Sequence, residues 1–179
     1  MPSADDFRKI YAYNFAVLDA YARKLERLPW PVVSKDRGAT WHSMAGVFHH
    51  ITRVYDGWLN YTVQGCSADE PMRGRRWDSL TSMKEVRASL AKVRSGIEPL
   101  LEDLTDADLR RKVKAEWQPK ACSLADAFAQ VTLEQAHHLG EIIAMLWQED
   151  IEPPEMTWLA TNWALEAKRR TRRVRTRSR

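Results

Sequence analysis

The sequence Leu133-Glu134-Gln135-Ala136-His137-His138-Leu139-Gly140-Glu141-Ile142-Ile143 decides how the chain is interpreted. It holds a carboxylate and an imidazole four residues apart, at Glu134 and His138, within an uninterrupted helical pattern. Side chains at this spacing lie on the same face of a helix. The stretch therefore predicts a helix that can offer two metal ligands, or two hydrogen-bonding residues, to a neighbouring helix.

The composition indicates a soluble globular chain. Its 179 residues are most simply one domain, and an apolar content of 44% is typical of a folded protein. The two cysteines, Cys66 and Cys122, form no CxxC pair, which favours reduced thiols inside the cell. The sequence starts without a signal-peptide pattern, and it has no apolar run near the roughly 18 residues of a membrane span. We therefore expect a cytoplasmic protein with no membrane partner.

Positive charge is concentrated at the end of the sequence. The formal net charge is +4, but residues 168–179 hold one Lys and seven Arg without an acidic residue. The remaining 167 residues hold 20 basic and 24 acidic residues, a net charge of −4. Such a segment can bind nucleic acid phosphates, but no aromatic residues accompany the arginines to stack on bases. We therefore predict a domain over 1–167 and a solubilising basic tail over 168–179.

Helical periodicity and Ser or Asp caps predict an all-α fold. The expected long helices cover residues 3–28, 41–63, 82–101 and 123–149, and a short fifth helix covers 155–168. The connection 64–79 is too long for a simple turn and is expected to cross the bundle. Only residues 113–117 have a strand-like pattern. The predicted architecture is a four-helix bundle with long crossover connections and a short C-terminal fifth helix.

Apolar residues occur on two sides of the fourth predicted helix, which we therefore expect to be central and covered on two flanks. The second of these sides consists of Ala129, Leu133, Gly140, Ala144 and Trp147. The eight tryptophans of the chain are expected mainly in the core and at interfaces, because each ring removes a large area from water.

Helical positions distinguish the histidines within each adjacent pair. His50 falls about 100° from the centre of the apolar seam of the second helix and is the one placed to face the bundle, whereas His49 falls about 160° away, on the outer side. On the fourth helix His138 faces inward, Glu134 lies at the rim of the same groove, and His137 lies further round. His50, Glu134 and His138 would provide three ligands with an open position, as in catalytic zinc sites. A histidine near a helical seam is also common as a hydrogen-bonded core residue, and this alternative stays open.

A di-iron centre is a rival interpretation of the same stretch. Glu134-x-x-His137 is half of the motif used by carboxylate-bridged di-iron bundles. Those bundles need two such motifs and two further glutamates, and the sequence has no second Glu-x-x-His. We therefore discount a di-iron centre.

Two segments resemble the DinB/YfiT-like family. One is Phe48-His49-His50-Ile51 with Trp58 eight residues after His50, and the other is Ala136-His137-His138-Leu139-Gly140-Glu141-Ile142. Members of the family pair a His-Ile helix with a His-x-x-His-His-x-Gly-Gln helix. The resemblance implies a four-helix bundle, usually a homodimer, that binds one divalent metal ion through three histidines.

The resemblance assigns residues to this metal site. The first and third family ligands fall on His50 and His138, the second falls on Glu134, and the final glutamine falls on Glu141. A carboxylate is a good ligand for zinc, nickel or manganese, but it removes one positive charge relative to histidine and should raise the pKa of a bound water. His137 and Glu141 would lie beside the ligands rather than on the ion.

The resemblance also implies a class of function. It indicates a metal-dependent enzyme that transfers a low-molecular-weight thiol or hydrolyses a small substrate, with a water or thiol on the metal as the nucleophile. The alternative is a non-enzymatic, stress-associated bundle whose metal braces two helices and whose basic tail binds nucleic acid or another polyanion. The sequence alone leaves open whether the chain is an enzyme.

Overall fold

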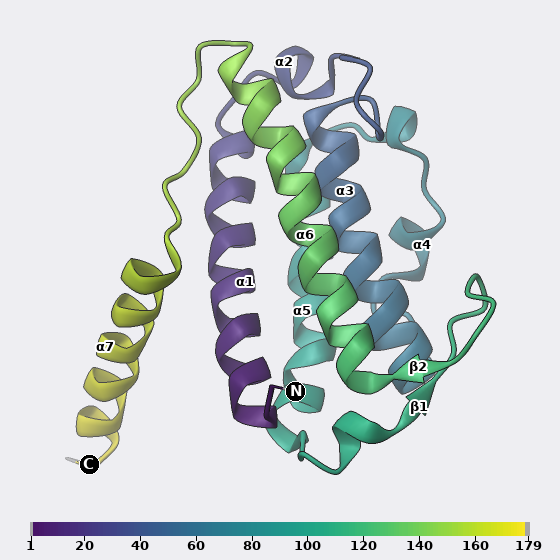
Figure 1. The fold of residues 1–179 in the computed structure, drawn as a ribbon. Coiled ribbons are helices and arrows are strands. Elements are labelled where there is room, and N and C mark those ends of the chain that lie inside the picture. Colours follow the sequence, from purple (N-terminus) through teal and green to yellow (C-terminus); the bar gives the residue numbers. More distant parts are fainter. Residues whose placement is uncertain (1, 178–179) are drawn as a thin grey trace.

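A computed structural model describes the backbone of residues 2–177 and the side chains of residues 2–167. Four long helices pack side by side, as Figure 1 shows. They are α1 (Ala4–Glu26), α3 (Met44–Tyr55), α5 (Met83–Asp103) and α6 (Leu124–Trp147). The prediction of an all-α four-helix fold is confirmed.

Serine caps fix where each long helix begins. Ser3, Ser43, Ser82 and Ser123 each accept a hydrogen bond from the backbone N–H three residues further on. In α1, α5 and α6 an acidic side chain at that third residue also accepts a bond from the cap's backbone N–H, which closes a capping box. The start of α6 is therefore defined locally by the sequence, and with it the turns that carry Glu134 and His138.

An aromatic cluster joins α1, α3 and α6 at the centre of the bundle. The ring of Tyr11 makes edge contacts with Phe15, Tyr55 and Phe128 at centroid distances of 5.0 to 6.1 Å. The buried hydroxyl of Tyr11 donates to the carbonyl of Phe128 at 2.9 Å, and that of Tyr55 donates to Gln135 Oε1 at 2.6 Å. Such aromatic pairs contribute about 0.5–1.5 kcal/mol each beyond their buried area. They hold α3 against α6 close to the histidines.

The remaining elements lie in the connections. They are α2 (Trp30–Ser34), α4 (Glu70–Arg73), the 3-10 helices η2 (Trp77–Ser79) and η3 (Asp108–Arg110), and the strands β1 (Lys112–Val113) and β2 (Cys122–Ser123). The chain between α3 and α5 runs back along the outside of α3, so that these two helices are parallel (Figure 1). This is the expected crossover. Of the strand-like pattern predicted at 113–117, only Val113 lies in a strand, β1, which pairs antiparallel with β2; residues 114–117 are not in a strand.

The second predicted helix differs from a regular α-helix at both ends. It begins at Met44 rather than 41, and Asp56–Thr62 forms a π-helix, η1. The buried carboxylate of Asp56 accepts hydrogen bonds from Asn60, Ser67 and the backbone of Ala68. These bonds connect the wide π-helical turns of η1 to the crossover connection. π-Helical turns are rare and occur frequently at functional sites.

Two expectations about burial are wrong. The second apolar side of α6 is exposed, with Leu133 at 66% and Trp147 at 55% exposure, because within the described residues no element covers that flank. Of the eight tryptophans, Trp58 is buried and Trp30 and Trp41 pack partly buried against the core, so the expectation of burial in the core is wrong for most of them; a position at interfaces stays a prediction. Helical periodicity identifies apolar faces, but it does not show which of them receive a partner within the same chain.

The fifth helix is longer than predicted and lies beside α1. It is α7 (Trp158–Arg177), whereas the sequence pattern ended it near residue 168. The side chains of the basic segment 168–179 lie outside the described residues, so its predicted role stays a prediction. None of the described helices is long and apolar enough to cross a membrane.

Candidate metal centre

His50 lies on the side of α3 that faces α6. Its ring stacks on the indole of Trp41, with centroids 4.1 Å apart and planes within 14°. Burial, and then electrostatic interaction with the His138 ring and the Arg53 guanidinium, lower the pKa of His50 to about 3. The imidazole is therefore neutral near pH 7, and one ring nitrogen keeps the lone pair that a metal ion needs.

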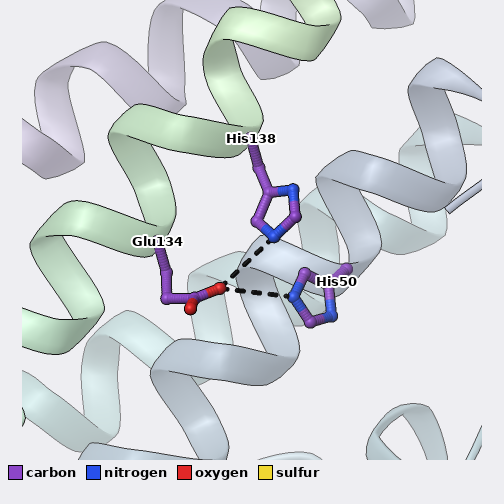
Figure 2. Close-up of side chains that lie close together, drawn as sticks. All are labelled: His50, Glu134 and His138. Atoms are coloured by element: carbon purple, nitrogen blue, oxygen red, sulfur yellow. Dashed lines mark ion pairs between the residues drawn. The ribbon is translucent and has the colours of Figure 1, made fainter. Parts of the chain in front are cut away.

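Glu134 and His138 come from α6, one turn apart. Glu134 Oε2 lies 3.3 Å from Nε2 of His138 and 3.7 Å from Nε2 of His50, and Figure 2 shows both nitrogens directed at this oxygen. The three potential ligand atoms all lie within 4.8 Å of one another. Ligands of a tetrahedral zinc ion are roughly 3.3 Å apart, given metal–ligand distances near 2.0–2.1 Å. The spacing and chemistry of these groups fit a small divalent ion.

Hydrogen bonds orient both α6 side chains. Gln130 Nε2 donates to Glu134 Oε1 at 2.8 Å, which leaves Oε2 for the histidines. Nδ1 of His138 lies 3.0 Å from Glu141 Oε2, and Thr40 Oγ1 donates to Glu141 Oε1 at 2.7 Å. A carboxylate can only accept, so Nδ1 of a neutral His138 carries the proton and Nε2 carries the lone pair.

Glu141 remains ionised in this arrangement. Partial burial raises the pKa of its carboxyl group, but the hydrogen bonds from His138 and Thr40 outweigh burial and leave the pKa below its usual range. An ionised Glu141 holds the His138 ring in one tautomer. This is the carboxylate–histidine arrangement that commonly supports a metal ligand.

The predicted neighbours His137 and Glu141 occupy different positions. Glu141 contacts His138 directly, whereas His137 is exposed and only its ring edge meets His138, at a centroid distance of 4.9 Å. His137, His138 and Glu141 also lie close enough for a second ligand set. In that set Glu141 faces Nδ1 of His138, the nitrogen that carries the proton in the neutral ring, so the set with His50 has the better chemistry.

His49 is buried, which its position on the outer side of the helix did not predict. The residue is 2% exposed, and its Nε2 lies 3.2 Å from the carbonyl oxygen of Arg75 in the crossover connection. The crossover covers the face of α3 that points away from α6. His49 is therefore a packing residue beneath this connection and is separate from the ligand set.

The loop 35–43 brings Trp41 and Thr40 to the centre, and sequence reasoning missed both. The guanidinium of Arg37 pairs with Glu149 at 2.7 Å and fastens the loop to the end of α6. His42 adopts a left-handed backbone with φ of 68°, and its ring stacks on Trp77 at 4.1 Å. No local pattern predicts these contacts, because they join segments far apart in sequence.

Gln130 was also missed, although the sequence contained a signal for it. It precedes Glu134 by four residues, and a glutamine one helical turn away is within hydrogen-bonding distance of a carboxylate.

The fold and this cluster define a helical bundle with a candidate metal centre between two of its long helices. The family model of the DinB superfamily matches residues 17–142, and the chain belongs to this superfamily. The crystal structure of a DinB-like protein from Bacillus cereus has a similar fold, with a TM-score of 0.67. The two proteins are 18% identical over 87% of this chain and 98% of that chain. No curated protein matched the sequence significantly.

Proposed function

We propose that the chain binds one divalent metal ion, zinc, nickel or manganese, through His50, Glu134 and His138. The observation that carries the proposal is the convergence of two histidine Nε2 atoms on Glu134 Oε2, at 3.3 and 3.7 Å. Two neutral imidazoles and one carboxylate suit all three metals. They leave a net charge of +1 on the complex and at least one coordination position without a protein ligand.

The second part of the proposal is that the centre serves an enzyme. A divalent ion with an open position supplies a Lewis acid that lowers the pKa of a water or thiol. Three protein ligands are typical of catalytic sites, whereas structural zinc sites are closed by four. The resemblance to the DinB family points to transfer of a low-molecular-weight thiol or hydrolysis of a small substrate as the reaction class.

The residues around the centre support such a role. The stacked indole of Trp41 shields one face of His50 from water. Glu141 holds the Nδ1 proton of His138, and Gln130 holds the second oxygen of Glu134. These contacts keep the three ligand groups in place before an ion arrives, which lowers the entropic cost of binding it.

Metal analysis of the purified protein tests the first part. We expect close to one divalent ion per chain in the wild type and almost none in the double variant His50→Ala/His138→Ala. Glu134→His should keep the ion, because it restores three histidines. His137→Ala is the matched control and should keep the ion as well. Unchanged metal content in the double variant would overturn the ligand assignment.

Thiol consumption tests the second part. Zinc-loaded and metal-stripped protein should be compared with a panel of small thiols and electrophilic substrates, with product formation followed by mass spectrometry. We expect turnover only with the loaded protein. A wild type that binds one ion but gives no turnover with any pair would leave metal binding intact and count against the enzymatic proposal.

A further inference from the structure

A cavity adjoins the candidate centre at His50. Its volume is about 240 Å³, and its wall is largely aromatic. The lining residues are Trp41, His50, Arg53, Val54, Gly57, Trp58, Arg73 and Trp117. A cavity of about 150 Å³ can hold benzene, so this one has room for a substituted ring or a compact aliphatic group. Because His50 lines it, a molecule bound here would lie beside the proposed metal ion.

Three tryptophans form the apolar wall. Trp58 and Trp117 meet edge to face at a centroid distance of 5.7 Å, and Trp41 lies against His50. Gly57 allows this close packing, because a Cβ atom at this position would lie 3.2 Å from the ring of Trp117. Trp117 is nonetheless 48% exposed, and an exposed ring at the edge of a cavity can stack on a bound apolar group.

The charged residues of the cavity are both arginines. Within the described part of the chain, the guanidinium of Arg53 makes no hydrogen bond or ion pair. Burial, and then the positive charge of Arg73, lower the pKa of Arg53 below its usual range. Half-buried charges are normally paired, so an arginine without a partner in an aromatic cavity indicates a site for an anion.

Arg73 is held in position by a ring. Its guanidinium lies 3.6 Å from the centroid of Tyr61, a cation–π contact, and its ion pair with the largely exposed Glu70 is 3.6 Å long. An exposed pair of this length contributes little. Stacking on Tyr61 fixes the plane of the guanidinium and leaves its N–H donors available to a ligand.

We propose that this cavity binds a compact organic anion, with its carboxylate on Arg53 and Arg73 and its apolar body against Trp41, Trp58 and Trp117. The assignment deepens the proposed function, on which it rests, by naming the class of substrate. None of the described residues that line the cavity is acidic, and the proposed ion would add further positive charge at His50. An anionic substrate would balance that charge and would be attracted to the site.

Titration calorimetry with three ring compounds of nearly equal shape tests the charge selection. Benzoate, benzamide and benzylamine carry negative, zero and positive charge, and each should be titrated into metal-stripped and zinc-loaded protein. We expect benzoate to bind both forms, and benzamide and benzylamine to bind at least about tenfold more weakly. Equal binding of benzoate and benzamide would overturn the proposal, and so would the absence of benzoate binding at millimolar concentrations.

Variants locate the bound anion. Arg53→Gln and Arg73→Gln should each weaken benzoate binding about tenfold or more, while Arg53→Lys keeps the charge and should recover part of the loss. Arg110→Gln removes an exposed arginine outside the cavity and should have no effect. Wild-type affinity in both Gln variants would place the anion elsewhere and overturn the assignment.

Metal content of the same samples separates the two proposals. A wild type that retains no metal but binds benzoate through Arg53 would reject the proposed metal site and support the anion site. Variants that keep wild-type metal content and melting temperature but lose benzoate binding would support both. A wild type that retains metal but does not discriminate by charge would reject the anion site alone.

Discussion

Glu134 is the residue on which the chemistry of the centre depends most. Its Oε1 accepts a hydrogen bond from Gln130, and its Oε2 faces His50 and His138. In the family pattern that the sequence resembles, a histidine stands at this position. A carboxylate lowers the charge of the complex by one unit, which weakens its power to acidify a bound water. Arg53 and Arg73, which we propose to bind an anion, line a cavity together with His50 and add positive charge beside the candidate centre.

Glu141→Ala tests the supporting hydrogen bond at the scale of one residue. Loss of the carboxylate frees the Nδ1 proton of His138 and allows the ring to rotate, so metal affinity should fall about 10- to 100-fold. The measurement is competition with a chromophoric chelator. His137→Ala, which removes a neighbouring imidazole without a hydrogen bond to a ligand, should leave the affinity unchanged. Equal losses in both variants would contradict the role given to Glu141.

At the scale of the element, the path of α3 into the π-helix η1 shapes the cavity. The π-helical turns place Gly57 and Trp58 along its wall. Asn60 in the same turns donates to the carbonyl of Val93 at 3.1 Å, which fixes η1 against α5. The close approach of the two helices requires a glycine on α5. A Cβ atom at Gly96 would lie 2.6 Å from Oδ1 of the buried Asn60.

Gly96→Ala and Gly140→Ala form a matched pair that tests this contact. Replacing a helical glycine by alanine favours the helix by up to about 1 kcal/mol when space is available. A Cβ at Gly140 meets nothing within 4 Å, so Gly140→Ala should raise the melting temperature by about 2–4 °C. Gly96→Ala should lower the melting temperature, because displacing Asn60 costs about 1–3 kcal/mol. A rise of similar size in both variants would show that the α5 contact is looser than described.

The sequence predicted the helices and the meeting of His50, Glu134 and His138, but not the residues around them; that these three bind a metal ion stays a prediction. Helical periodicity placed Glu134 and His138 on one face, and it separated His50 from His49, because these relations depend on a single helix. The stacking of Trp41 on His50 and the proximity of Arg53 and Arg73 in one cavity depend on the positions of a loop and a crossover connection, which no local pattern encodes. The expected cover over Leu133 and Trp147 is not provided by the described part of this chain, for the same reason: an apolar face does not specify its partner.

At the scale of the whole molecule, two features bear on stability and assembly. His49, which is buried, and His50, which is half-buried, are neighbours about 100° apart around α3, and burial favours the neutral form of both. The exposed side of α6 carries Leu133 and Trp147 around small residues, and it offers an apolar surface to a second copy of the chain. The homodimer implied by the family resemblance stays a prediction.

Acid should destabilise the metal-free protein. Burial lowers the pKa of His49 below its usual value, and it lowers the pKa of His50 to about 3. As the pH falls, these two histidines take up protons near pH 6.5 in the unfolded chain but only at lower pH in the folded chain. The free energy of unfolding is therefore fully retained above about pH 6.5 and decreases as the pH falls towards 3. In urea unfolding, His50→Gln should reduce the decrease in the free energy of unfolding by up to about 1.4 kcal/mol per pH unit. His137→Gln is the control and should keep the wild-type slope. The same pH dependence in wild type and His50→Gln would contradict the low pKa.

Light scattering with size exclusion tests assembly through α6. We expect a dimer for the wild type, and a monomer for Leu133→Asp and Trp147→Asp, since a buried charge would oppose association. Leu159→Asp changes an exposed apolar residue of α7 and should leave the dimer intact. A monomeric wild type would reject the homodimer, and dissociation by Leu159→Asp alone would move the interface to α7.

Anomalous diffraction from crystals of the zinc-loaded protein, recorded on either side of the zinc absorption edge, tests the central claim most directly. We predict a single strong peak per chain, within bonding distance of His50 Nε2, Glu134 Oε2 and His138 Nε2, with Nδ1 of His138 still bonded to Glu141. A peak at His137 and Glu141, or no peak between α3 and α6, would contradict the account.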